Sequence, residues 1–136
     1  MKCPKNIVFV CHSNRNRSKA GEEIFSAMLR RRGYILYSID ALDHYDAYVS
    51  SAGTCEDADD NTNQFDKHVA DGADIIFAAD DYVRNVAIRE YKQPREKIIS
   101  LKIPDCYSTK SPELRKRLEE LLKPYADEWY PPKAKR

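Results

Sequence analysis

Residues 8–25 read VFVCHSNRNRSKAGEEIF, in which an apolar run passes through a polar loop into a pattern typical of a helix. Arg15, Arg17 and Lys19 stand close to the start of this helix. Because a helix N-terminus carries partial positive charge, cations there are unfavourable unless an anion lies beside them. Backbone N–H groups of a loop that curls onto a helix bind anions, and a guanidinium holds two oxygens of a phosphate. The stretch therefore predicts a binding site for a phosphate-like dianion.

Short apolar runs alternate with helical patterns along the rest of the chain. The predicted strands cover residues 6–10, 47–51, 73–79 and 96–103. The predicted helices cover about residues 18–32, about residues 64–70, a stretch carrying Val83, Val86 and Ala87, and a final segment from Pro112 until Pro124 disrupts it. This alternation is typical of an α/β fold around a parallel sheet, whose carboxyl edge binds ligands. We expect a single domain over residues 1–136, with three α/β/α layers, a central four-stranded parallel sheet and a loose tail from about residue 129.

Composition and charge exclude several classes of protein. The chain has 136 residues, of which 42% are hydrophobic, and no apolar run approaches the ~20 residues of a membrane span. Its cysteines are too few and too scattered for a disulfide framework or a zinc site, so we expect reduced thiols in a cytoplasmic protein without a membrane partner. Basic residues dominate residues 1–36 and 82–136, whereas acidic residues dominate residues 37–81. This distribution lacks the continuous basic face of a nucleic-acid binder, and we expect no nucleic-acid partner.

Cys11 opens the polar loop, Arg17 ends it and Ser18 follows. The chain has only 4 glycines, and neither G-x-G-x-x-G nor G-x-x-x-x-G-K-[ST] can be written anywhere in it. A thiol beside arginines and a helix N-terminus ionises easily, with pKa values of such thiols falling to roughly 3.5–7.5. A thiolate in a phosphate site indicates nucleophilic phosphoryl transfer. The alternative is that Cys11 is a small buried apolar residue at the end of a strand, the commoner role of a lone cysteine.

The acidic stretch CEDADDNTN matches a calcium-binding loop only in part. Asp57, Asp59 and Asn61 occupy the first three ligand positions of an EF-hand, but Thr62 replaces the required glycine and His68 replaces the bidentate glutamate. We therefore interpret the stretch as a solvated loop and expect no metal site in it.

VFVCHSNRNRS resembles the Cys-x5-Arg-Ser signature of the low-molecular-weight protein tyrosine phosphatases, in its place after the first strand and before the first helix. The resemblance continues in chain order with SSAGT at residues 50–54, ADIIFAADD at residues 73–81 and IPDCYSTKSPEL at residues 103–114. The chain looks most like a short bacterial branch of predicted phosphatases of this fold. The resemblance implies the family's α/β fold and a cysteine-dependent phosphomonoesterase. Its substrate would be a phosphotyrosine-containing protein or a small aryl phosphate, with no cofactor or metal.

The resemblance also implies a role for each matching residue. Cys11 is the nucleophile, Arg17 and the loop amides hold the phosphate oxygens, and Asp105 is the general acid and then the general base. Ser18 donates its hydroxyl to the sulfur. Asn14 tolerates the left-handed backbone that such a tight loop needs. The predicted substrate-binding residues are His12, Ser13, Asn14, Arg15, Asn16, Ser18 and Tyr107.

Several positions depart from the family's pattern. Asn16 stands where many members have a second cysteine, and Cys106 replaces the proline that usually follows the acid. Asp105 is alternatively an ordinary turn residue, because aspartate after proline often is. Tyr107 either stacks on a substrate ring or packs against the protein.

Other functions share parts of this pattern. The loop also resembles the Cys-x-Ser-Asn-x-Asn-Arg-Ser motif of the RNA polymerase C-terminal-domain phosphatases, which act on phosphoserine. Arsenate reductases of the same fold use two additional closely spaced cysteines, whereas Cys55 and Cys106 are far apart in this sequence. A third alternative is a phosphate-binding module without turnover, against which only Asp105 argues.

Overall fold

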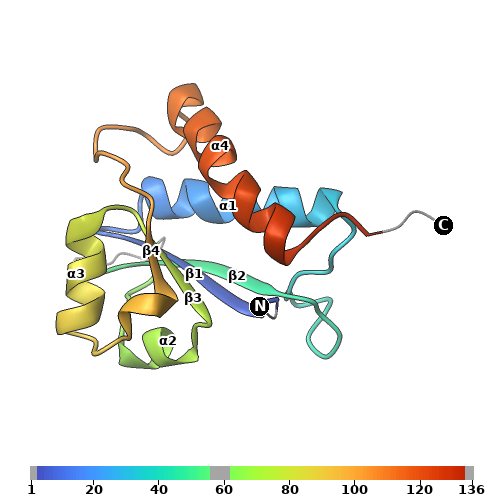
Figure 1. The fold of residues 1–136 in the computed structure, drawn as a ribbon, viewed down its shortest axis with the longest axis horizontal. Coiled ribbons are helices and arrows are strands. Elements are labelled where there is room, and N and C mark those ends of the chain that lie inside the picture. The colour runs from blue at the N-terminus through green and yellow to red at the C-terminus, as the bar shows by residue number, and fades with distance from the viewer. Residues whose placement is uncertain (1–2, 56–61, 134–136) are drawn as a thin grey trace.

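A four-stranded parallel sheet forms the centre of the computed structural model, which describes residues 3–55 and 62–133 (Figure 1). The sheet confirms the predicted architecture, with the strands in the order β2-β1-β3-β4. The strands are β1 (Asn6–Cys11), β2 (Tyr48–Gly53), β3 (Ile75–Ala78) and β4 (Ile98–Ser100). The central strands β1 and β3 are almost continuously apolar, because helices cover both of their faces.

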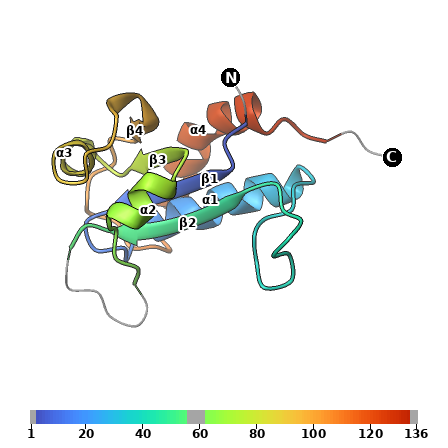
Figure 2. The same cartoon turned by 90° about the horizontal axis from the view of Figure 1, so that it is seen from below.

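Helices cover the two faces of the sheet and complete the three layers (Figures 1 and 2). The helices are α1 (Arg17–Arg31), α2 (Lys67–Gly72), α3 (Asp81–Arg89) and α4 (Pro112–Trp129), with a short 3₁₀ helix at Arg95–Lys97. Helices α1 and α4 lie on one face, and α2 and α3 lie on the other. Within residues 3–55 and 62–133, no helix is both long enough and apolar enough to cross a membrane.

Alternate residues of the strands belong to two separate hydrophobic clusters, one on each face of the sheet. Phe9 and Phe77 face α1 and α4, whereas their neighbours Val8 and Ile76 face α2 and α3. The rings of Phe9 and Phe77 stack with their centroids 4.8 Å apart. Phe25 of α1 packs at 5.9 Å from both rings. This aromatic packing fixes α1, and therefore the loop before it, on the sheet.

Helix α1 begins and ends where the sequence predicts. Arg17 is its first residue, so the predicted start near Ser18 is confirmed within a residue. At the other end, Gly33 has φ +96° and its N–H donates to the carbonyl of Arg30, as expected for a helix-terminating glycine.

The last helix continues through Pro124, which corrects the prediction that this proline disrupts it. Proline removes one helical hydrogen bond and costs about 3 kcal/mol. Leu122, Ala126 and Trp129 are nevertheless buried, and burial of a large apolar side chain contributes about 1.5–3 kcal/mol. Pro124 itself is exposed, where its ring meets solvent. Packing on both sides of the proline therefore outweighs its local cost.

Residues 129–133 are packed against the protein, which corrects the prediction of a loose tail from residue 129. Trp129 and Tyr130 are both buried in the cluster between α1 and α4. The Tyr34 hydroxyl donates to the carbonyl of Pro131, and the Lys133 N–H donates to the carbonyl of Arg32 at 2.9 Å. The rest of the predicted tail, residues 134–136, lies outside the described residues.

The fourth strand is shorter than predicted. Residues 95–97 form the 3₁₀ helix, and β4 ends at Ser100 rather than at residue 103. The N–H groups of Leu101 and Ile103 still donate to the carbonyls of Ala78 and Ala79, both at 2.8 Å. Lys102 between them has φ +54°, which breaks the regular strand. This irregular extension leads the chain directly to Asp105.

Candidate active site

The loop that joins β1 to α1, residues 11–16, lies at the carboxyl edge of the sheet and is called the Cys11 loop below. Cys11 pairs in register with Gly53, the last residue of β2. The N–H of Thr54 donates to the Cys11 carbonyl at 3.0 Å, and the N–H of Cys55 donates to the His12 carbonyl at 2.6 Å. The chain after β2 therefore holds the backbone of the Cys11 loop.

Gly53 allows the two segments to approach closely. A Cβ atom at this position would lie 2.6 Å from the Asn14 nitrogen and 2.7 Å from the Ser13 carbonyl carbon. Both atoms belong to the backbone, which cannot move aside as the end of a flexible side chain could. Position 53 thus requires glycine for the observed shape of the Cys11 loop, a role that the sequence alone did not assign.

The Cys11 sulfur is buried and lies within hydrogen-bond distance of two polar groups. Cys11 is the last residue of β1, which is buried between its neighbouring strands, and the residue is only 3% exposed. Its Sγ accepts from the Asn14 N–H at 3.2 Å and lies 3.0 Å from the Ser18 Oγ. The Asn14 side-chain amide donates to the Ser18 Oγ at 2.9 Å, so the hydroxyl proton of Ser18 is free to point at the sulfur when the sulfur is a thiolate. Both donors stabilise negative charge on the sulfur.

Asn14 braces the Cys11 loop from inside. It has φ +56°, which confirms the predicted left-handed conformation, and it is fully buried. Its Oδ1 accepts from the N–H of Asn63 at 2.7 Å, while its Nδ2 donates to Ser18. Asparagine fits here because it tolerates positive φ and carries both an acceptor and a donor.

Arg17 is buried and held by Asp80, the N-cap residue of α3 in the connection that follows β3. Its Nη1 donates to the Asp80 Oδ2 at 2.7 Å and to the Ile103 carbonyl at 2.6 Å, and the residue is 4% exposed. The other oxygen of Asp80 accepts from the N–H of Val83 and caps α3. Asp80 thereby fixes the guanidinium beside the Cys11 loop.

Sequence reasoning did not assign a role to Asp80. A signal was present, because Asp80 follows β3, the neighbour of β1, and ligands bind where adjacent parallel strands end. A carboxylate next to a buried arginine at that edge is a natural partner for it.

Asp105 reaches the same site from the chain that follows β4. Its Oδ1 lies 3.7 Å from the Arg17 Nε, and its side chain is 64% exposed. The structure therefore brings Asp105 to Arg17, the residue that directly follows the Cys11 loop. Asp105 approaches from the solvent side, whereas Cys11 and Arg17 form the buried floor.

The remaining predicted residues differ in their placement. His12 and Arg15 are exposed on the Cys11 loop, while Ser13 and Asn16 are half-buried. Tyr107 packs against the hydrophobic cluster between α1 and α4, which is the packing alternative rather than an exposed platform for a substrate ring. Asp57, Asp59 and Asn61, from the rejected calcium loop, lie outside the described residues. Among the residues that the structure does describe, no cluster of three or more metal-ligating side chains occurs.

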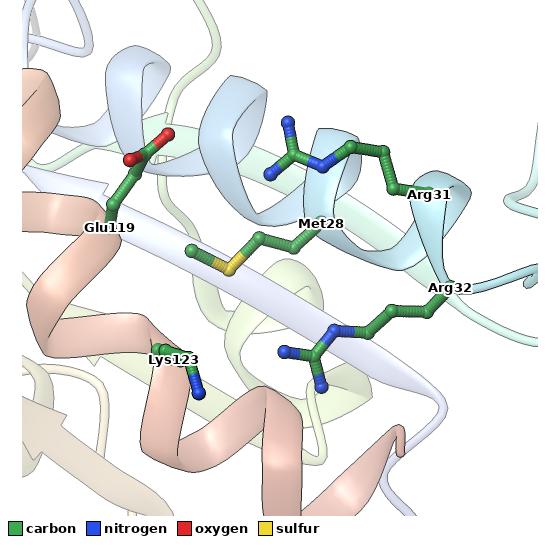
Figure 3. Close-up of a pocket in the computed structure, with 5 residues that line it drawn as sticks. All are labelled: Met28, Arg31, Arg32, Glu119 and Lys123. Atoms are coloured by element: carbon green, nitrogen blue, oxygen red, sulfur yellow. The ribbon is translucent and has the colours of Figure 1, made fainter. Parts of the chain in front are cut away.

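A pocket lies far from the Cys11 loop, at the C-terminal end of α1 (Figure 3). Arg31 lies at the opposite end of α1 from Arg17, and a helix of this length spans about 20 Å. The basic side chains of Arg32 and Lys123 in this pocket both pair with Asp127. The pocket is therefore separate from the candidate active site.

Comparison with known proteins identifies the fold. No protein-family model matches the sequence, and no curated protein matches it. A low-molecular-weight protein tyrosine phosphatase from Bacillus subtilis is 20% identical with a TM-score of 0.65, over 90% of this chain and 95% of that chain. The tyrosine phosphatase Wzb from Escherichia coli K30 is 19% identical with a TM-score of 0.67, over 92% and 98% of the two chains. The YwlE arginine phosphatase, in a mutant with a phosphorylated active-site serine, is 19% identical with a TM-score of 0.68, over 90% and 94%.

These similarities extend across almost the whole length of each protein. The chain has the fold of the low-molecular-weight protein tyrosine phosphatases, as its sequence motifs predicted. The similar proteins carry two different substrate names, phosphotyrosine for one and phosphoarginine for another, so the fold alone does not assign a substrate.

Proposed function

We propose that the protein is a cysteine-dependent phosphatase that hydrolyses protein phosphotyrosine or small aryl phosphates through a phosphocysteine intermediate. The observation that carries this proposal is the environment of Cys11. Its sulfur accepts from the Asn14 N–H and lies 3.0 Å from the Ser18 hydroxyl, which can donate to a thiolate, inside a loop that ends at the buried guanidinium of Arg17. A buried structural cysteine has no need of such donors, whereas a nucleophilic thiolate does.

In the first step, the Cys11 thiolate attacks phosphorus, and the S–P bond forms as the P–O bond to the leaving group breaks. The loop N–H groups and Arg17 hold the equatorial phosphate oxygens and stabilise the charge that develops on them. Asp105 transfers its proton to the leaving oxygen, so that a neutral phenol departs. The position of Asp105 near Arg17, on the solvent side of the site, supports this role.

In the second step, water attacks the phosphocysteine and releases inorganic phosphate. The carboxylate of Asp105 accepts a proton from the attacking water, which regenerates the acid for the next cycle. Cys11 departs as a thiolate, and the hydrogen bond from Ser18 stabilises it as the S–P bond breaks. Asp80 supports both steps indirectly, because it holds Arg17 in place.

The alternatives differ in the substrate or in the turnover. The neighbouring YwlE structure is named an arginine phosphatase, so phosphoarginine is a second substrate class beside phosphoserine. Arsenate reduction requires a relay of cysteines, but Cys55 is half-buried behind the Cys11 loop and Cys106 is exposed on a different segment. A binding module without turnover needs no acid at the position that Asp105 occupies. A catalytic thiol also requires a reducing environment, which agrees with the expected cytoplasmic location.

The proposal is tested by hydrolysis of para-nitrophenyl phosphate and of phosphotyrosine, phosphoserine and phosphoarginine peptides in the presence of a chelator. Cys11→Ser should abolish turnover of every substrate, while Cys3→Ser, at an exposed thiol before β1, should leave it unchanged. Asp105→Asn should lower kcat/KM about 100-fold or more for phosphotyrosine. Activity that survives Cys11→Ser would overturn the proposal, and a preference for phosphoserine or phosphoarginine would replace its substrate class.

A further inference from the structure

The segment that carries Asp105 is tied to the Cys11 loop at a second point. The N–H of Thr109 donates to the Asn16 Oδ1 at 3.1 Å. The Thr109 hydroxyl lies 2.5 Å from the Arg15 carbonyl and 3.1 Å from the same Asn16 oxygen, so its proton is directed at these acceptors. Two acceptors of the Cys11 loop, the Arg15 carbonyl and the Asn16 Oδ1, thus bind one residue of the Asp105 segment.

The other end of the segment is fixed as well. The carbonyl of Ile103 accepts from the Arg17 guanidinium at 2.6 Å, and the Ile103 side chain is fully buried. Between this point and Thr109 the chain contains Pro104, Asp105 and Cys106, which are all exposed. The exposed turn that carries Asp105 therefore lies between two hydrogen-bonded ends. Ile103 at one end is bound to Arg17, and Thr109 at the other end is bound to the Cys11 loop.

Thr109 is also connected to the helical layer. Its carbonyl accepts from the Arg115 Nη1 at 3.2 Å, and the same nitrogen pairs with Glu23 of α1 at 3.1 Å. Thr109 is thus linked through Arg115 to helices α1 and α4, and through Asn16 to the Cys11 loop. A residue with this many constraints has a defined position, which its exposed neighbours in the turn do not share.

We propose that Thr109 and Asn16 form a latch that positions Asp105 for proton transfer to the leaving group. The inference rests on the proposed function and deepens it, because it names the residues that control the acid. Thr109 and Asn16 act through Asp105 in this respect and are positioning residues. Without the latch, the turn keeps its attachments at Ile103, Tyr107 and Arg115 but loses its link to the Cys11 loop, and the carboxyl group samples positions from which it cannot reach the leaving oxygen.

The latch predicts a specific dependence on the leaving group. Thr109→Val keeps the shape of the side chain and removes the hydroxyl, whereas Thr109→Ser keeps the hydroxyl. With phenyl phosphate, whose leaving phenolate is about as basic as tyrosinate at pKa ~10, Thr109→Val should lower kcat/KM about tenfold. With 2,4-dinitrophenyl phosphate, whose leaving group departs without a proton, the loss should stay below about twofold. Thr109→Ser should restore most of the activity toward phenyl phosphate.

A double-variant comparison separates positioning from general damage. In the Asp105→Asn background, adding Thr109→Val should change kcat/KM by less than about twofold, because the acid that the latch positions is already absent. Ser108→Ala is the matched control, since Ser108 is an exposed neighbour whose side chain forms no hydrogen bond within the described residues. An equal loss for both leaving groups, or a loss that persists without Asp105, would overturn the inference.

A readout that does not depend on activity distinguishes failure of the latch from failure of the proposed function. Amide hydrogen exchange of residues 105–108 should become faster in Thr109→Val than in wild type and should be unchanged in Ser108→Ala. Unchanged exchange in Thr109→Val would refute the latch even in a fully active enzyme. If wild type hydrolyses no phosphate ester but the exchange rates respond as expected, the proposed function fails while the connection between the two loops stands.

Discussion

The close approach of Gly53 to the Cys11 loop gives a prediction with a magnitude set by the structure. In Gly53→Ala, the new methyl group would lie 2.6 Å from the Asn14 nitrogen, whereas ordinary van der Waals contact begins at 3.4 Å. The loop or β2 must therefore shift by several tenths of an ångström. The Asn14 nitrogen is also the donor to the Cys11 sulfur, so a shift disturbs the 3.2 Å hydrogen bond to the proposed nucleophile.

Displacement on this scale is costly for catalysis but tolerable for folding. A misplacement of about 1 Å in a reacting group lowers rates by about 100-fold, while overpacking destabilises a fold by about 1–3 kcal/mol. We expect Gly53→Ala to fold and to lose about 10- to 100-fold in kcat/KM toward para-nitrophenyl phosphate. Its affinity for inorganic phosphate, measured by calorimetry, should fall in parallel, because we propose that the same loop amides bind the anion.

Gly72→Ala provides the matched control. Its added Cβ would lie 3.7 Å from the nearest atom, an ordinary contact, and the residue is the last of α2. This variant should retain full activity and gain slightly in stability, because alanine restricts the unfolded chain more than glycine does. If Gly53→Ala kept wild-type kcat/KM and phosphate affinity, the claim that β2 shapes the Cys11 loop would be wrong.

Three further predictions concern residues around the site and at the end of the last helix. Asp80→Asn should lower kcat/KM at least about tenfold and the free energy of unfolding by about 1–3 kcal/mol, because it removes the carboxylate that pairs with the buried Arg17. Equal urea midpoints and equal rates for wild type and the variant would contradict this. Asn14→Ala should reduce activity more than Asn14→Gly, because alanine adds about 1–2 kcal/mol of left-handed strain to the lost side-chain bonds; the reverse order would show that φ +56° is unimportant. Burial, with the Cys3 thiol beside it, raises the pKa of Tyr130 above its ordinary value of 10.0, so the unfolded chain loses this proton first and stability falls as pH rises above about 10. Tyr130→Phe should remove that fall, because phenylalanine has no hydroxyl to titrate; an equally large fall in the variant would contradict this.

The sequence was sufficient for the fold because its local and periodic signals agree. The apolar runs of β1 and β3 match strands buried on both faces, and Ser111 followed by Pro112 marks the start of α4 through a cap whose Oγ accepts from Leu114. The predicted disruption of the last helix at Pro124 was wrong, because the local propensity of proline does not include the packing of Trp129. That contribution depends on contacts with distant segments, which periodicity does not reveal.

The candidate site was predictable where its residues are contiguous and unpredictable where they are not. Cys11, Asn14, Arg17 and Ser18 fall within one short stretch, so a motif could identify them together. Asp80 and Thr109 meet that stretch only after folding, and their residue types are common in turns and caps. Gly53 was visible as part of a motif, yet only the three-dimensional arrangement shows which backbone atoms it accommodates.

The central claim is that Cys11 becomes covalently phosphorylated during turnover. The most direct measurement uses Asp105→Asn with 2,4-dinitrophenyl phosphate, a substrate that phosphorylates the enzyme without an acid, whereas release of the phosphoryl group needs the missing base. Rapid quenching followed by intact-protein mass spectrometry and peptide mapping should show one phosphoryl group, attached to Cys11. Turnover in which Cys11 never carries the phosphoryl group, or in which another residue carries it, would contradict the account.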